Sequence, residues 1–193
     1  TKYADEVGMI RQSIAATEAA YAYAKQHLAA GVTEVELFAG MQMAAAAHAG
    51  EVLGEFGNDF QIGANGSAPR RRPAQAGELA VFDLSVVRQG YRSDLCRSFV
   101  VGGKPSDTQL AAHERIMQVF DFVESRIQPG ASCREIFQAA HARLEGLRGW
   151  SFPHHLGHGI GLSAHEAPRL NPHWDDTFQI GDVFTVEPGL YSP

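Results

Sequence analysis

The stretch GVTEVELF, residues 31–38, decides the fold, because GASCREIF at residues 130–137 repeats its pattern. The two stretches match at Gly, at Thr or Ser, at Glu, at Leu or Ile, and at Phe, and they lie 99 residues apart. In each stretch a hydroxyl residue stands three positions before a glutamate, which is the spacing of a capping box at the start of a helix. Two such junctions can look alike by chance. The alternative, which we follow, is an internal repeat of two halves.

The first half reads outward from its junction as two helices followed by two strands. Apolar residues at three- and four-residue spacing predict a helix over residues 3–30, with Thr17 as its one polar interruption. The second helix follows Thr33 and is expected to bury one face. That face holds Leu37, Met41, Ala44 and His48. A stretch rich in Gly, Pro and Arg at 63–77 precedes strands expected at 78–87 and 91–101.

The second half repeats this plan but stops early. A helix is expected from Ser106 to about Ile127, with Gln109 at the capping-box position, and another from Ser132 to Leu144. Only residues 182–191 then remain for a strand. We therefore expect an α+β fold of two pseudo-symmetric helix–helix–strand halves, and a duplicated unit of this kind tends to bind its ligand between the halves.

The composition excludes several classes of protein. Of the 193 residues 45% are hydrophobic, which excludes a disordered chain, and the net charge of −6 argues against nucleic-acid binding. No apolar run approaches the roughly 18 residues of a membrane span, and the N-terminus lacks the layout of a signal peptide. Cys96 and Cys133 are too few for a disulfide framework, so we expect a reducing, cytoplasmic location with no membrane partner.

Two aspartates interrupt the apolar strands of the first half. If the turn centres between residues 88 and 89, Asp83 lies directly opposite Asp94, with Cβ atoms roughly 5 Å apart. Like charges so placed are destabilising, and a divalent cation or a shared proton would offset the repulsion. The other possibility is that one aspartate turns outward through a bulge and is solvated.

Four histidines crowd the segment SFPHHLGHGIGLSAHEAPRL at 151–170. Its glycines and Pro153 exclude the helical geometry of an HExxH zinc site, so we expect an extended segment whose glycines let a ligand approach the backbone closely. A lone histidine on an apolar face is usually a core residue, whereas four histidines interleaved with glycine favour a catalytic or metal-binding role. Carboxylate oxygens with one or two imidazoles suit Mn, Fe, Co or Zn.

Three segments together resemble the signature motifs of the pita-bread metallopeptidases, the group of methionine aminopeptidases, Xaa-Pro aminopeptidases and prolidases. The segments are VFDLSVVRQGYRSDLCRSFVVG at 81–102, HHLGHGIGLSAHEAP at 154–168 and GDVFTVEPGLY at 181–191. Their residues are more similar to those of the Xaa-Pro aminopeptidases and prolidases than to those of the methionine aminopeptidases. The resemblance implies the pita-bread fold, an antiparallel curved sheet flanked by helices, with residues 1–193 as one catalytic domain, and hydrolysis of a peptide or dipeptide substrate.

Carried over position by position, the resemblance implies a site with two divalent metal ions (Mn, Co, Zn or Fe). The implied ligands are Asp83, Asp94, His158 and Glu187. His165 would bind the scissile carbonyl and stabilise the tetrahedral intermediate, and His154 would line the substrate pocket. The metals would activate a water, and Glu187 would carry its proton to the leaving amine.

The sequence departs from the family pattern in four ways. The family has a fifth ligand, a glutamate about twenty residues beyond EPG, whereas six residues follow Glu187 here, so we expect a missing final strand. Arg70 stands where the Xaa-Pro branch has a substrate-binding His, and its fork would suit a substrate carboxylate; a solvated basic loop is the alternative. Ser85 replaces a glycine. The amino-terminal domain of many relatives, which helps to build a homodimer, is not in this sequence, so the homodimer stays an open expectation.

Three functions follow. The first is a metal-dependent Xaa-Pro peptidase, either dipeptidase or aminopeptidase. The second is a creatinase-like hydrolase of a non-peptide C–N bond, which works without metal. The third is a non-catalytic homologue that binds peptide or protein, and Arg70 together with the missing fifth ligand would favour it.

Overall fold

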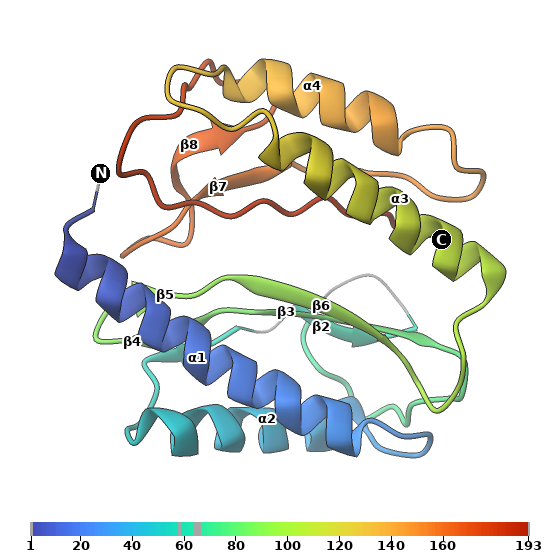
Figure 1. Ribbon diagram of the computed structural model, residues 1–193. Helices are drawn as coiled ribbons and strands as arrows, with labels where there is room; N and C mark the ends of the chain where they lie inside the picture. Colours follow the sequence, from blue (N-terminus) through green and yellow to red (C-terminus); the bar gives the residue numbers. More distant parts are fainter. Residues whose placement is uncertain (1, 58, 64–66, 193) are drawn as a thin grey trace. The chain divides into compact units, whose positions relative to one another are not determined.

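Two units divide the chain where the predicted repeat begins again. The computed structural model describes residues 2–57, 59–63 and 67–192. Residues 4–105 form what we call the N-terminal unit, and residues 2–3 with 106–192 form the C-terminal unit. Figure 1 shows two helices followed by strands in each, which confirms the predicted plan of the halves.

The N-terminal unit contains two helices and six short strands. In chain order they are α1 (Ala4–His27), α2 (Glu34–Ala49), β1 (Glu55–Phe56), β2 (Asp59–Ile62), β3 (Leu79–Leu84), β4 (Val86–Arg88), β5 (Tyr91–Arg92) and β6 (Leu95–Val100). The strands pair antiparallel in the orders β2-β3-β6 and β1-β4-β5. The two strands expected from the sequence are thus each broken in two, the first at Ser85 and the second at Ser93 and Asp94. Of the stretch at 63–77, residues 64–66 lie outside the described residues.

Helix α2 begins as the sequence predicts. The Thr33 side chain accepts a hydrogen bond from the Glu36 amide, and the Glu36 carboxylate accepts one from the Thr33 amide, which completes the capping box. The helix ends at Gly50, whose φ of 69° is the left-handed conformation of a helix C-terminus.

The buried face of α2 differs from the predicted one. Leu37 and Met41 are buried as expected, but the face continues through Ala45, while Ala44 is only partly buried and His48 is exposed. The buried residues Leu37, Met41 and Ala45 follow one another at intervals of four. The predicted face took an interval of three from Met41 to Ala44, and its later residues therefore lie closer to the solvent side of the helix.

The turn between β4 and β5 sets a register that corrects the prediction for the aspartates. Gln89 and Gly90 both have positive φ, 49° and 88°, as a two-residue type I′ hairpin loop requires. The turn therefore centres one residue later than expected, and Asp83 pairs with Cys96 rather than with Asp94. Asp94 lies two residues before Cys96, so the two aspartates are diagonal neighbours on one face of the hairpin.

Strand β2 was not predicted, because only four residues form it. Its Phe60 pairs with Phe82 of β3, and the two rings stack with centroids 4.1 Å apart in the core beneath the helices. Its Asp59 pairs with Asp83, so a further carboxylate lies beside one of the predicted ligands.

The C-terminal unit contains α3 (Asp107–Glu124), α4 (Cys133–Leu144), β7 (Gly157–Gly159) and β8 (Glu166–Leu170). Ser106 and Gln109 form the predicted capping box of α3, and the Ser132 side chain accepts from the Glu135 amide at the start of α4. Residues 182–191, expected as a strand, make only isolated bridges, with Phe184 opposite Gly159.

Equivalent hydrogen bonds confirm the internal repeat. The Gly31 amide donates to the Ala74 carbonyl at 2.8 Å, and the Gly130 amide donates to the Phe178 carbonyl at 2.8 Å. Both glycines have positive φ, 95° and 85°, which explains why the two junction stretches each begin with glycine. The likeness between them is therefore structural and not a coincidence of two capping boxes.

The same correspondence extends to the turn that follows. The Glu78 carboxylate accepts from the Gln75 amide, and the Asp182 carboxylate accepts from the Gln179 amide. The fifth residue after Glu78 is Asp83, and the fifth after Asp182 is Glu187. Two of the predicted ligands thus occupy equivalent positions in the two units.

Among the described residues, no helix has the length and apolar character needed to cross a membrane.

Candidate functional site

The glycines around His158 are required by the neighbouring backbone. A Cβ atom on Gly157 would collide with the Thr185 carbonyl, and one on Gly159 would collide with the Ala167 carbonyl. These neighbours pass so close because residues 183–187 and strand β8 run along the two sides of β7. The expectation that these two glycines make room for a ligand was wrong, since protein backbone fills that space.

His158 is the most deeply buried of the clustered histidines, with 4% of its side chain exposed. Its Nδ1 donates to the Gly159 carbonyl oxygen at 3.0 Å, and its Nε2 lies 3.0 Å from Oε1 of Glu187. A hydrogen bond at one ring nitrogen that fixes the direction of the other is the usual support of a metal-binding histidine. Within this unit the structure therefore brings two predicted ligands, His158 and Glu187, into contact.

Glu187 is held in its ionised form. Burial alone would raise the pKa of its carboxyl group, but contacts with His155 and His158 and the hydroxyl of Thr185 outweigh burial and hold the pKa well below its usual range. The Thr185 hydroxyl donates to Oε1 at 2.9 Å, and Nε2 of His155 lies 3.4 Å from the same atom. An ionised carboxylate among imidazoles is a suitable donor for a divalent cation.

His154 is fixed by both of its ring nitrogens. Nδ1 donates to the His155 carbonyl oxygen at 2.7 Å, which leaves Nε2, 3.1 Å from the Tyr191 hydroxyl, to accept from it. Burial lowers the pKa of His154, so the imidazole is neutral near pH 7. The ring also packs edge-on against Phe152. His154 is therefore a rigid wall beside Glu187, in keeping with a residue that lines a pocket.

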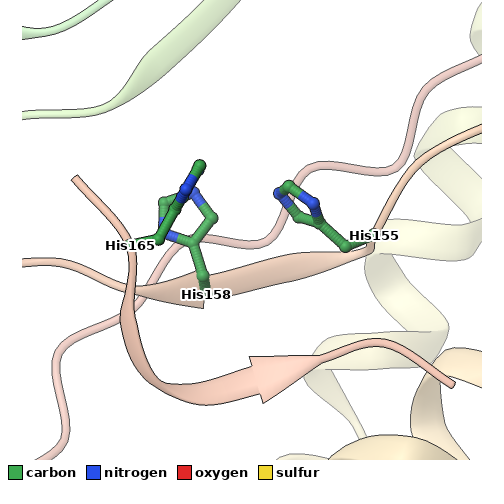
Figure 2. A group of neighbouring side chains, drawn as sticks. All are labelled: His155, His158 and His165. Carbon is green, nitrogen blue, oxygen red and sulfur yellow. The ribbon is translucent and has the colours of Figure 1, made fainter. Parts of the chain in front are cut away.

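Three histidine rings gather at the β7–β8 hairpin, as Figure 2 shows. The rings of His158 and His165 have centroids 4.0 Å apart, and the ring of His155 lies 5.3 Å and 5.4 Å from these two. His165 is exposed, so its ring is accessible to a ligand. The sequence reasoning missed His155, because the resemblance assigns no role to that position. The density of histidines in the segment was the only signal.

The N-terminal unit holds Asp83 and Asp94 through the backbone on either side of them. The Tyr21 hydroxyl lies 2.7 Å from the carbonyl oxygen of Phe82 and 2.6 Å from that of Leu95, the residues adjoining the two aspartates. Burial, together with the charges of Cys96 and Asp83, raises the pKa of Tyr21 well above its usual value, so the hydroxyl remains a donor. Tyr21 was predicted only as part of an apolar helix face.

Thr17 is not a polar interruption of that face but a partner of the hairpin. Its hydroxyl lies 2.6 Å from the Ser93 hydroxyl, and Ser93 Oγ in turn accepts from the Val86 amide. Helix α1 therefore fixes the residue just before Asp94, at the point where the two long predicted strands are broken.

Arg70 does not present its fork to a substrate. Nε and Nη2 donate to the two carboxylate oxygens of Glu34, at 2.9 Å and 2.6 Å, and Nη2 also donates to the Ile62 carbonyl. Glu34 is fully buried in the first turn of α2 and also accepts from the amides of Ile62 and Arg70. The prediction of Arg70 as a substrate-binding residue is thereby corrected: the fork holds Glu34, and it ties the loop to the helix.

The donor types at the predicted ligand positions fit a divalent metal. They comprise carboxylates at 83, 94 and 187 and one imidazole at 158, and oxygen-rich sets with imidazole suit Mn, Fe, Co or Zn. Within the C-terminal unit, His155, His158 and His165 also form a group in which one ring nitrogen of each residue lies within 4.8 Å of the other two.

Comparison with known proteins agrees with this chemistry. The chain matches the model of metallopeptidase family M24 over residues 8–193. It is 35% identical to an Xaa-Pro dipeptidase of Pyrococcus horikoshii over 62% of this chain and 34% of that protein. It is 28% identical to an Xaa-Pro dipeptidase of Lactobacillus delbrueckii subsp. lactis, over all of this chain and 53% of that protein.

Solved structures give the same result for the fold. The prolidase from Pyrococcus furiosus superposes on the whole chain with a TM-score of 0.88 at 26% identity, over 58% of the prolidase. An Escherichia coli aminopeptidase P, at 20% identity and a TM-score of 0.84, shares the fold. The pita-bread fold predicted from the three motifs is thus confirmed.

The chain spans between a third and about half of the length of these Xaa-Pro dipeptidases. The family match, by contrast, covers nearly all of its residues, in both units. This chain therefore belongs to metallopeptidase family M24.

Proposed function

We propose that this chain performs metal-dependent hydrolysis of a peptide bond, with Xaa-Pro peptides as the substrate class. The observation that carries the proposal is the contact between buried His158 and ionised Glu187 at 3.0 Å, in a chain that belongs to a metallopeptidase family. Relatives named Xaa-Pro dipeptidase support the choice of substrate class. We also propose that the N-terminal and C-terminal units, each of which has two helices followed by strands, act together as one catalytic domain.

We assign the metal ligands by the motif positions of the sequence. They are Asp83, Asp94, His158 and Glu187. One or two divalent ions held by them would lower the pKa of a coordinated water toward neutrality and so supply a nucleophile. Manganese, cobalt, zinc and iron all suit this donor set, and we propose manganese first because the set is rich in carboxylates.

The chain's own residues then have separate tasks. Glu187, kept ionised by its histidine neighbours, would take a proton of the attacking water and pass it to the leaving nitrogen. His165, exposed beside His158, would donate to the carbonyl oxygen as its charge develops, a role whose loss often lowers the rate by about 10²–10³. His154, held by Tyr191, would form a fixed wall of the substrate pocket.

The alternatives lose one of their supports. The non-catalytic reading depended in part on Arg70 as an unusual binding residue, and that side chain is engaged with Glu34. A creatinase-like reaction needs no metal, so retention of a carboxylate-rich ligand set does not favour it. A homodimer and a cytoplasmic location stay predictions of the sequence.

A metal-binding and hydrolysis experiment tests the proposal. The 193-residue chain is titrated with Mn²⁺ by calorimetry and assayed on an Xaa-Pro dipeptide and an Xaa-Pro-Xaa tripeptide. We expect Mn²⁺ binding and cleavage, both lost in Asp94→Asn and both kept in Asp121→Asn, a matched change on the exposed surface of α3. His165→Ala should keep Mn²⁺ and lose turnover.

Each other outcome contradicts part of the proposal. No Mn²⁺ binding would contradict the ligand set, and Mn²⁺ binding without cleavage of either peptide would favour a non-catalytic homologue. Cleavage of the dipeptide alone would identify a dipeptidase, and cleavage of the tripeptide would identify an aminopeptidase.

A further inference from the structure

The three-histidine group of the C-terminal unit has the elements of a metal site of its own. His155 precedes β7, His158 lies at the centre of β7 and His165 directly precedes β8, so one short hairpin supplies all three rings (Figure 2). We propose that His155, His158 and His165 bind one Zn²⁺ ion as an imidazole site that needs neither Asp83 nor Asp94.

The distances are compatible with such a site after small side-chain movements. Zinc binds histidine nitrogen at about 2.0–2.1 Å, which places the nitrogens of a tetrahedral site about 3.4 Å apart. The three ring nitrogens lie within 4.8 Å of one another. His158 is fixed by its hydrogen bond to Gly159, whereas His155 is partly exposed and His165 is exposed, so these two rings can close on it by rotation about their side-chain bonds.

Glu187 supplies a fourth donor. Its Oε1 lies 3.0 Å from Nε2 of His158 and 3.4 Å from Nε2 of His155. The same carboxylate oxygen therefore faces Nε2 of both rings, and a metal cation among them would be coordinated by both imidazoles and the carboxylate at once.

The donor type decides the metal. Three imidazoles and one carboxylate match the nitrogen-rich tetrahedral sites of zinc, whereas the harder Mn²⁺ prefers oxygen. The site is distinct from the proposed catalytic set because it adds His155 and His165 and omits both aspartates. Zinc bound here would occupy His158 and His165 and so inhibit the peptidase, a consequence that rests on the proposed function, while zinc binding itself does not.

The test separates the two sites by metal and by variant. Zn²⁺ affinity is measured by competition with a chromophoric chelator in the full chain carrying Asp83→Asn and Asp94→Asn, which removes the carboxylates of the catalytic set. We expect one Zn²⁺ to bind to this double variant. Adding His155→Ala should weaken the affinity at least about tenfold, since the loss of a mere supporting partner of a ligand already costs about 10–100-fold. Adding His113→Ala, on the exposed face of α3, should not.

A second measurement guards against a variant that folds poorly. X-ray absorption at the zinc edge of the double variant should show three imidazole ligands. Fewer than three, or an affinity unchanged by His155→Ala, would overturn the proposal, as would a double variant that binds no Zn²⁺. The catalytic set is tested separately in the otherwise unchanged chain: Mn²⁺ binding that survives Asp94→Asn contradicts the proposed function and leaves the zinc site untouched.

Discussion

Removing the Arg70 side chain should destabilise the N-terminal unit through Glu34. In Arg70→Ala the carboxylate of Glu34, which is fully buried in the unchanged chain, loses both guanidinium bonds and keeps the backbone amides of residues 62 and 70 as donors. Hydrogen bonds to charged groups contribute about 1.5–3 kcal/mol each, and leaving one partner of a buried ion pair alone costs about 3–5 kcal/mol. Arg70 itself is 39% exposed and therefore screened, so we expect a loss near the lower end, about 3 kcal/mol.

The loss should depend on pH in a defined direction. Burial alone would raise the pKa of Glu34, but the Arg70 contacts and the backbone amides outweigh it, and the pKa is lowered from its usual 4.5. The pair therefore stabilises the fold above pH 4.5 and loses this effect as pH falls through the lower folded-state pKa. Without Arg70 the carboxylate loses the guanidinium contacts that lower its pKa, so the folded-state pKa of the variant lies above that of the wild type. The difference between wild type and Arg70→Ala is expected to be smaller at pH 4.5 than at pH 7.

The assay must report on the correct unit. Both tryptophans, Trp150 and Trp174, lie in the C-terminal unit, so their fluorescence reports the unfolding of that unit. Circular dichroism reports the helices of both units, and a change in the urea transition seen by circular dichroism but not by fluorescence is assigned to the N-terminal unit. The exposed Arg71→Ala is the matched control and should change the free energy of unfolding by less than about 0.5 kcal/mol. Adding Glu34→Gln to Arg70→Ala removes the buried charge and should recover part of the loss. A loss under about 1 kcal/mol at pH 7, equal losses at both pH values, or strictly additive variants would refute the reasoning.

Two further changes test the supports of the candidate site. Tyr21→Phe removes the hydroxyl that contacts the carbonyls of Phe82 and Leu95, and we expect a loss of about 1–3 kcal/mol in urea unfolding followed by circular dichroism; an unchanged midpoint would show that the hydroxyl does not hold these strands. Gly159→Ala places a methyl group against the Ala167 carbonyl, so tryptophan fluorescence should report a loss of about 1–3 kcal/mol in the C-terminal unit. A variant as stable as wild type would mean that the β7–β8 hairpin accommodates the methyl group without a loss in the free energy of unfolding.

The helices could be predicted because their signals are local. A capping box involves residues three positions apart, and the boxes at Thr33 and Ser106 form as the sequence indicates. The register of the aspartate hairpin could not be predicted equally well, because it depends on which two residues form the turn. Gln89 is a non-glycine residue with positive φ, and its side chain does not predict that conformation. Moving the turn by one residue changed the partner of Asp83 from Asp94 to Cys96.

The polar contacts of the core were missed for a different reason. Tyr21 and Thr17 stand on an apolar helix face, and their partners are more than sixty residues away in the sequence. No pattern within a helix indicates which distant carbonyl a buried hydroxyl will meet. The same holds for Arg70, whose partner Glu34 lies 36 residues earlier in the sequence.

The internal repeat explains why similar carboxylates have different roles. Glu78 and Asp182 occupy equivalent turns, and each accepts a hydrogen bond from the backbone amide three residues earlier, so their charge is used to shape the chain. Asp83 and Glu187 follow five residues later, at equivalent positions beyond these turns. Residue type alone cannot separate the first pair from the second, since all four are acidic. Position within the repeat does, and it assigns a structural carboxylate and a candidate ligand to each unit.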